Sequence, residues 1–193
     1  MEVGVLAVQG AVSEHEDALH RAADALGMPV NVRAVRSASD MDGLQGIILP
    51  GGESTTISRL LRSTGIQPIL MERGGKDLAV FGTCAGMILL ASRADHDVAE
   101  KDIQLLGLLD ATVDRNAFGR QRESFEGPVT FDGEEMHAVF IRAPCFADCN
   151  DVVLAVHGER IVAASRGSVM GVAFHPELTP DTRIHERFLQ SCS

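Results

Sequence analysis

Apolar residues in the first half of the chain fall into short runs that alternate with stretches of helical spacing. Met1–Val8 is nearly continuous in apolar residues and predicts a buried strand. The segment after it predicts a helix that begins with a capping box of Ser13 and Glu16 and ends at Gly27. The residues that share one face of this helix are Ala18, Leu19, Ala22, Ala23 and Leu26.

The same rhythm continues as far as residue 90. Val30–Val35 alternates apolar and polar residues, as an edge strand does, and Gly46–Leu49 predicts a short buried strand. Ser54 is placed to cap a helix, and a short helix at Gln67–Arg73 leads to the buried strand Leu78–Phe81. This order of strands and helices is typical of a doubly wound parallel sheet, in which ligands bind at the carboxyl ends of the strands.

The second half of the chain changes to short strand-like runs separated by turn signals such as Asp132-Gly133. We expect antiparallel strands that extend the sheet, at Ile103–Val113, Val129–Phe131, Met136–Ile141, Val152–Val156, Ile161–Ser165 and Ser168–Phe174. A closing helix is predicted from Thr179, with Pro180 in its first position. We therefore expect one α/β domain over residues 1–193, with a doubly wound, mostly parallel sheet, helices on both faces and an antiparallel extension.

Composition narrows the class of protein. The chain has 193 residues, enough for a core that is stable without disulfide bridges. A net charge of −10 and the absence of Trp and Tyr argue against a nucleic-acid or anionic-membrane surface. No apolar run approaches the roughly 18 residues of a membrane span. The first residues carry no secretory signal pattern, so we expect a cytoplasmic protein with reduced cysteines.

The stretch Gly82-Thr83-Cys84-Ala85-Gly86 follows a buried strand and precedes an apolar helical run. Flanking glycines around a thiol predict a sharp strand-to-helix turn that is too crowded for larger side chains, which is the nucleophile-elbow pattern with Cys in place of Ser. The positive end of the helix dipole would favour the reactive thiolate of Cys84. The alternative is a small buried thiol, so a nucleophile at Cys84 requires a base elsewhere in the chain.

His175 is the candidate base, because it follows an apolar strand at the place where a side chain can reach a site. Glu177 lies two residues later and can hydrogen-bond the imidazole, which completes a Cys84–His175–Glu177 triad. The other histidines, which we expect to be structural or solvated, are His15, His20, His96, His137, His157 and His185. Cys145, Cys149 and Cys192 are likewise expected to be structural.

The stretch Pro50-Gly51-Gly52-Glu53-Ser54 places a glycine pair at a strand-to-helix turn, where backbone N–H groups can face an oxyanion. A plain glycine turn is the alternative. A phosphate loop does not fit, because GxxxxGK[ST] requires a lysine that is absent here. A zinc deaminase does not fit either, because no Pro-Cys-x-x-Cys follows His175, and Cys145 with Cys149 would need two further ligands.

These motifs together resemble the class I, triad-type glutamine amidotransferases. Within that class the chain is similar to the glutaminase subunits of pyridoxal 5′-phosphate synthase. The similarity covers essentially the whole chain, through Gly4–Val12, Pro50–Thr56, Gly82–Gly86, Arg115–Gln121, Val139–Pro144 and Phe174–Thr179. The fourth and fifth of these stretches are the specific ones, because other amidotransferases differ there. Ala94–Asp102 is long and charged for the family, and we expect it on the surface.

The resemblance implies hydrolysis of L-glutamine to L-glutamate and ammonia through a thioester on Cys84, with His175 as acid and base and Glu177 orienting it. Backbone N–H groups near Gly52 and Ala85 would hold the oxyanion. The ammonia would pass to a separate synthase subunit that builds pyridoxal 5′-phosphate from a pentose phosphate and a triose phosphate. This reaction requires neither a metal nor a bound cofactor.

The resemblance also implies a glutamine site made of Gly52, Glu53, Ser54, Arg115, Ile141 and Arg142. An arginine fork suits the α-carboxylate of the substrate, and either Arg115 or Arg142 could supply it. For each of them an ordinary surface salt bridge is the alternative. Gln9 and Gly51 are expected near the oxyanion loop and the partner interface. We also expect partner-dependent activity, with a flip of the Gly51-Gly52 peptide as the switch.

Two other functions share part of this pattern. A stand-alone thiol hydrolase or peptidase of the related Cys-elbow fold would share Cys84, but such enzymes typically lack His-Pro-Glu at the last strand. A non-catalytic binding module would keep the fold for docking, but packing alone does not call for Cys84, His175 and Glu177 at these places.

Overall fold

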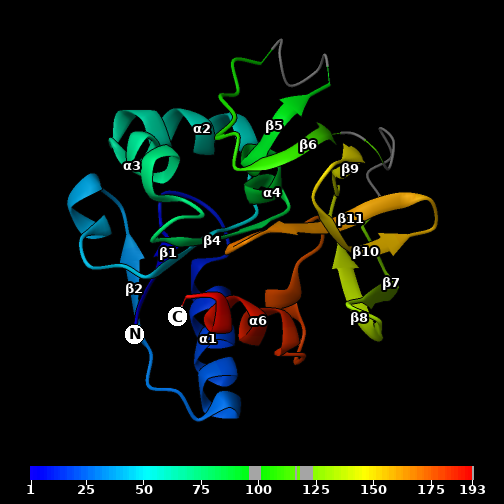
Figure 1. Ribbon diagram of the computed structural model, residues 1–193, viewed down its shortest axis with the longest axis horizontal. Coiled ribbons are helices and arrows are strands. Elements are labelled where there is room, and N and C mark those ends of the chain that lie inside the picture. The colour runs from blue at the N-terminus through cyan, green and yellow to red at the C-terminus, as the bar shows by residue number, and fades with distance from the viewer. Residues whose placement is uncertain (96–100, 116, 118–123, 193) are drawn as a thin grey trace.

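The computed structural model describes residues 1–95, 101–115, 117 and 124–192. In this part of the chain the strands form one mixed sheet in the order β2-β1-β3-β4-β12-β11-β10-β7-β8, with β5, β6 and β9 attached beside it. Helices α1 and α6 pack together on one face, while α2, α3 and α4 lie on the other (Figure 1). The fold class predicted from the sequence is therefore confirmed.

The elements of the first half follow the predicted order. They are β1 (Glu2–Leu6), α1 (Val12–Leu26), β2 (Asn31–Val35), the 3-10 turn η1 (Ala38–Met41), β3 (Gly46–Leu49), α2 (Ser54–Ser63), α3 (Ile66–Arg73), β4 (Ala79–Thr83), α4 (Ala85–Leu90) and β5 (Ala91–Ala94). Every residue of β3 and β4 is buried, as expected for strands covered by helices on both faces. Neighbouring strands of the β2-β1-β3-β4 part run parallel.

The second half supplies most of the antiparallel part of the sheet. Its elements are β6 (Leu109–Asp114), β7 (Phe125–Phe131), β8 (Glu134–Phe140), β9 (Cys145–Cys149), β10 (Val152–His157), β11 (Arg160–Arg166), β12 (Val169–Val172), the 3-10 turn η2 (Pro176–Leu178) and α6 (Arg183–Ser191). The expectation of antiparallel pairing is wrong for one side of β6, which runs parallel to β5 and antiparallel to β9, and for one side of β12, which runs parallel to β4 and antiparallel to β11. This parallel pair brings the ends of β4 and β12 to the same edge of the sheet.

Three predicted helix starts are wrong. Helix α1 begins directly after Ala11, and the Ser13 hydroxyl contacts the neighbouring Glu14 instead of capping. Glu53, not Ser54, caps α2, because its carboxylate accepts the backbone N–H groups of Thr55 and Thr56. Helix α6 starts at Arg183, whose N–H donates to the Asp181 carboxylate. The predicted N-cap of that helix, Thr179, instead ends η2, its N–H and hydroxyl both bonded to the Pro176 carbonyl.

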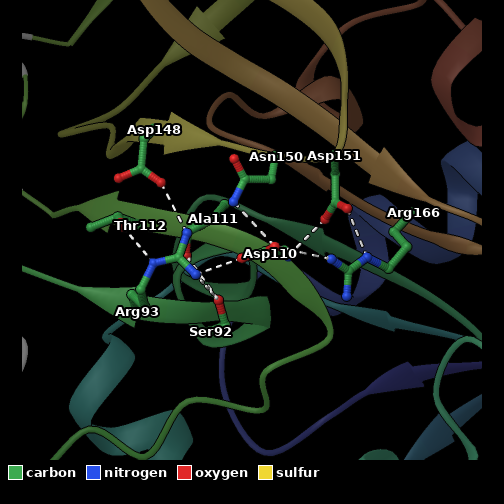
Figure 2. Close-up of polar contacts among 9 residues, drawn as sticks. All are labelled: Ser92, Arg93, Asp110, Ala111, Thr112, Asp148, Asn150, Asp151 and Arg166. Carbon is green, nitrogen blue, oxygen red and sulfur yellow. Dashed lines mark hydrogen bonds and ion pairs between the residues drawn. The ribbon is translucent and has the colours of Figure 1, made fainter.

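An ion-pair cluster joins the strands at the outer end of the sheet. Arg93 on β5 pairs with Asp110 on β6 and with Asp148 on β9, and Arg166 on β11 pairs with Asp151 (Figure 2). The Asp151 carboxylate also accepts the backbone N–H of Asp110. Two arginines and three aspartates thus link β5, β6, β9 and β11 at this side of the sheet.

Candidate active site

Cys84 lies at the sharp turn between β4 and α4, with φ 48° and ψ −103°. The predicted crowding of this elbow is confirmed. A Cβ on Gly82 would lie 2.6 Å from the carbonyl carbon of Gly86, and one on Gly86 would lie 2.0 Å from the carbonyl oxygen of Leu49 on β3. The two glycines therefore allow the backbone to approach closely enough to expose Cys84 at the end of the strand.

His175 follows β12 and is placed beside Cys84 because β12 pairs with β4 in parallel. Its backbone N–H donates to the Val139 carbonyl on β8 at 2.8 Å, and its Nδ1 lies 2.7 Å from Glu177 Oε1. Both side chains are almost completely buried. Pro176 opens the 3-10 turn η2, which carries Glu177 back toward the imidazole.

Electrostatics favour a protonated His175. Burial alone disfavours the charged ring, but hydrogen bonds with Cys84 and Glu177, together with the negative charge of Glu177, outweigh burial and raise the pKa of His175 to about 10. The protonated His175 ring lies between the Cys84 thiol and the Glu177 carboxylate and can donate a proton. This arrangement is the one that a nucleophile, an acid–base group and an orienting carboxylate require.

The Gly51-Gly52 turn lies directly against these side chains. A Cβ on Gly51 would lie 2.5 Å from His175 Cε1 and 3.3 Å from the Cβ of Cys84, so only glycine fits there. The N–H of Gly51 donates to Thr83 Oγ1 at 3.0 Å. Gly10 packs over the Gly51 carbonyl, where a Cβ would come within 2.2 Å of the oxygen. The β1–α1 turn therefore covers this peptide from behind.

A pocket of about 170 Å³ opens beside Cys84. Its lining residues are Gly52, Glu53, Ser54, Cys84, Ala85, Ile88, Lys101, Arg115, Ile141 and Arg142. The structure thus brings together every residue that the sequence assigned to substrate or oxyanion binding. His175, Glu177, Gln9 and Gly51 do not line the pocket, but the Gln9 side chain accepts the N–H of Glu53 at its rim.

The sequence analysis missed two of the lining residues, Ile88 and Lys101. Ile88 lies one helical turn after Cys84, a spacing that could have identified it. Lys101 belongs to the charged segment Ala94–Asp102, of which residues 96–100 lie outside the described residues, and no motif marks it. Of the stretch Arg115–Gln121, only Arg115 and Ala117 belong to the described residues.

Glu53 is fully engaged by its neighbours. One carboxylate oxygen accepts the N–H and hydroxyl of Thr56 at 2.8 and 2.9 Å, and the other accepts Arg115 Nη2 at 3.0 Å. Burial raises the pKa of Glu53, but hydrogen bonds from Thr55 and Thr56 outweigh it and lower the value to about 2. Glu53 therefore caps α2 and fixes Arg115 at the side of the pocket.

Two buried polar atoms in the pocket lack a hydrogen-bond partner among the described residues. They are the hydroxyl oxygen of Ser54 and Nη1 of Arg115. Buried polar groups are usually paired, so unpaired ones in a pocket indicate where a ligand binds. The Cys84 thiol contacts the carbonyl of another lining residue, Ile141, at 3.8 Å, and the next residue, Arg142, has φ 45°.

The described residues hold no group of three His, Cys, Asp or Glu side chains that could bind a metal ion, and all four cysteines are free thiols. A second cavity, of about 250 Å³, lies between the β7–β8 turn and α6. There Arg183 pairs with Glu134, and Arg187 pairs with Asp132. Its charged groups are thus already matched, and the nucleophile is absent from its lining. In the described part of the chain no helix is long and apolar enough to cross a membrane.

The parallel sheet, the cysteine elbow and the His175–Glu177 pair give the arrangement that thiol enzymes with a Cys-His-Glu triad have, at the carboxyl ends of the strands. The profile of the SNO glutamine amidotransferase family matches residues 5–193, so the chain belongs to that family.

Known proteins resemble the chain over its whole length. The chain is 50% identical to "Pyridoxal 5'-phosphate synthase subunit PdxT" of Methanoregula boonei, covering 99% of this chain and 98% of that protein. Identity is also 50% to the protein of the same name from Archaeoglobus fulgidus, with 98% of each covered. A solved structure described as "Crystal structure of glutamine amidotransferase" matches with a TM-score of 0.88 and 45% identity over 98% of each chain. The glutaminase domain of Trypanosoma brucei CTPS, at 14% identity and a TM-score of 0.59, shares the fold alone.

Proposed function

We propose that this chain is a glutaminase that hydrolyses L-glutamine to L-glutamate and ammonia, within one glutamine amidotransferase domain over residues 1–193. The observation that carries this proposal is the arrangement of Cys84, His175 and Glu177 beside a pocket in which Ser54 and Arg115 have donors without a partner among the described residues. The family membership supports the same reaction. The pocket suits a small polar substrate with a carboxylate.

In the first half of the reaction, the Cys84 thiolate attacks the carboxamide carbon of glutamine. The tetrahedral oxyanion is held by backbone N–H groups near Gly52 and at Ala85, the first residue of α4, whose N–H has no acceptor within the helix. His175 then gives its proton to the amide nitrogen. The C–N bond breaks, ammonia leaves, and a thioester joins Cys84 to the glutamyl carbon.

In the second half His175 accepts a proton from water, and the resulting hydroxide attacks the thioester carbon. The C–S bond breaks, L-glutamate leaves, and the thiolate of Cys84 is restored beside the imidazolium. Glu177 keeps the ring oriented through both halves, because its Oε1 holds Nδ1 at 2.7 Å. Each step uses groups of this chain and water only.

Arg115 is the better candidate for the α-carboxylate of glutamine, because its Nη1 has no partner within the described part of the chain. Its Nη2 is already held by Glu53, so the guanidinium reaches the pocket in a fixed orientation. Ser54 contributes its hydroxyl, and Ile141 and Arg142 also line the pocket. Because Glu53 is engaged as a cap, it positions Arg115 in this proposal.

The partner we propose is the synthase subunit of pyridoxal 5′-phosphate synthase, in a hetero-oligomeric complex that uses the ammonia in the cytoplasm. The names of the relatives support this partner. The Gly51-Gly52 peptide is the candidate switch, because glycine on both sides tolerates a flip, while the preceding N–H, that of Gly51, is anchored by Thr83. We therefore expect low activity of the chain alone and a rise on binding the synthase.

Covalent labelling tests the nucleophile and the substrate class together. A chloroketone analogue of L-glutamine should add one equivalent to the protein, and peptide mass spectrometry should locate it on Cys84. L-glutamine should slow the labelling, whereas L-leucine should not. Cys149, a half-buried free thiol, is the internal control and should stay unlabelled. Labelling that ignores L-glutamine, or that is slowed as well by L-leucine, would favour the stand-alone thiol hydrolase.

A further inference from the structure

Two buried histidines lie behind the triad, and the proposed reaction does not use them. His15 on α1 and His185 on α6 are completely buried where the two helices pack together. The sequence analysis expected both to be structural or solvated. Their rings lie against Phe81 on β4, with the His15 and Phe81 ring centres 6.3 Å apart and perpendicular. An apolar side chain in either place would avoid the free-energy cost of burying ring nitrogens, so packing alone does not explain two histidines here.

The nitrogens of His15 contact the triad and the elbow. Its Nε2 lies 3.5 Å from Glu177 Oε2 and 3.2 Å from Thr83 Oγ1, and its Nδ1 lies 3.1 Å from His185 Nε2. The same Thr83 oxygen accepts the N–H of Gly51. His15 therefore contacts both Glu177, which orients His175, and Thr83, which holds the N–H of Gly51 in the oxyanion turn.

The hydrogen-bonding requirement of the Glu177 carboxylate indicates which nitrogen of His15 carries the proton. Its Oε1 faces His175, while its Oε2 is buried with no hydrogen-bond partner within normal distance among the described residues. A carboxylate only accepts, so the group next to Oε2 should present a donor, which here is Nε2–H of His15. In that tautomer Nδ1 of His15 accepts the N–H of His185.

The other charged groups nearby keep His15 neutral. Burial lowers its pKa well below the usual value, and the neighbouring His185 and His175 lower it further. Burial, together with Arg21, lowers the pKa of His185 to about 3. A neutral ring can donate to Glu177 without adding a positive charge that would compete with His175 for that carboxylate.

We propose that His15 is a positioning residue of the triad. Its imidazole donates Nε2–H to the side of the Glu177 carboxylate that faces away from His175, and its contact with Thr83 couples the carboxylate to the Gly51 peptide. His185 holds the tautomer from behind. This inference deepens the proposed glutaminase function and rests on it for the kinetic part of its test.

Two substitutions at position 15 separate positioning from packing. In His15→Gln the side-chain amide nitrogen can reach the place of Nε2 and donate to Glu177, whereas in His15→Asn it reaches only the place of Nδ1. Both variants are polar and smaller than histidine. Leu19→Ala is the matched control, because it removes buried volume one turn later on the same helix.

The first readout is the pKa of His175, measured by ¹⁵N NMR of the full chain with labelled histidine. We expect His15→Asn to lower this pKa by about one unit or more, because Glu177 loses the donor that holds it toward His175. His15→Gln and Leu19→Ala should leave it close to the wild-type value. The groups facing His175 in this measurement, Cys84 and Glu177, are the same in all three variants.

The second readout is glutamine turnover in the complex with the synthase subunit. His15→Asn should lower kcat on the order of 10- to 100-fold with little change in KM, and His15→Gln should keep most of the turnover. Equal behaviour of His15→Asn and His15→Gln, or an equal pKa shift in Leu19→Ala, would overturn the proposal. If the wild type has no turnover, the glutaminase proposal fails, and the NMR comparison still decides on His15.

Discussion

The polar side chains around Cys84 form two groups. In one group the donors and acceptors are already hydrogen-bonded, and in the other a donor or acceptor has no partner among the described residues. Glu53 has both carboxylate oxygens engaged by Thr55, Thr56 and Arg115. Ser54 and Arg115 each keep a buried atom without a partner among the described residues. The second group is the one that a substrate can complete, and it contains both hydroxyl and guanidinium donors.

Arg115→Gln tests this division at the residue scale. Loss of a hydrogen bond between charged groups costs about 1.5–3 kcal/mol, so we expect KM for glutamine to rise roughly 10- to 100-fold with kcat nearly unchanged. Arg142→Gln should have a smaller effect. Arg59→Gln, an exposed change on α2 outside the pocket lining, is the control. A larger KM increase for Arg142→Gln than for Arg115→Gln would assign the carboxylate to Arg142 instead.

Residue types restrict the candidates for chemistry more than they restrict local capping. Cys84, His175 and Glu177 could be selected as candidates because glycine spacing and a His-Pro-Glu string restrict what else they can be, and the structure brings His175 beside both of the others. Ser54 could not be told apart from Glu53 as a cap, since both residue types accept N–H groups and only the structure shows which side chain turns back. His15 lies in an ordinary amphipathic helix, so no local pattern distinguishes it from a core residue.

At the scale of elements, the β4–α4 elbow depends on how closely α4 approaches β3. The backbone of Gly86 lies so near the Leu49 carbonyl that a methyl group would have to displace one of the two. The same turn fixes Cys84 in its left-handed conformation. Packing and nucleophile geometry are therefore determined by the same contact.

Gly86→Ala should accordingly lower both stability and activity. Overpacking of this kind costs about 1–3 kcal/mol, which we expect to see in the free energy of unfolding from urea titration. Gly127→Ala on β7 is the matched control, because the nearest atom to its added Cβ lies 4.0 Å away. A Gly86→Ala variant with wild-type stability and full labelling at Cys84 would show that the elbow does not need this contact.

Buried elements could be predicted from the sequence more accurately than exposed ones. Strands β3 and β4 are covered on both faces and appear in the sequence as continuous apolar runs. Strands β5 and β9 were missed, because both are short and each exposes two of its residues. The run Ile103–Val113 was predicted as one strand, but only its end from Leu109 pairs, in β6. Alternation alone does not show where a partner strand begins.

At the scale of the whole molecule, the sheet order gathers segments that lie far apart in the sequence. Strand β12 inserts between β4 and β11, which brings His175 to Cys84 although the two residues are 91 positions apart in the sequence (175 − 84). The sequence indicated that both follow strands, but their adjacency depends on the parallel pairing of β4 with β12, which local patterns do not encode. The resemblance to amidotransferases supplied that information.

The most direct test of the account is glutamate release from L-glutamine by the wild type and by Cys84→Ala, each with and without the cognate synthase subunit. We predict turnover only for the wild type, with a large increase when the synthase is present. Cys84→Ala should still form the complex, as measured by sedimentation, so that its inactivity reflects the missing thiol. Equal turnover of the wild type with and without the synthase would contradict the proposed coupling, and turnover by Cys84→Ala would contradict the triad itself.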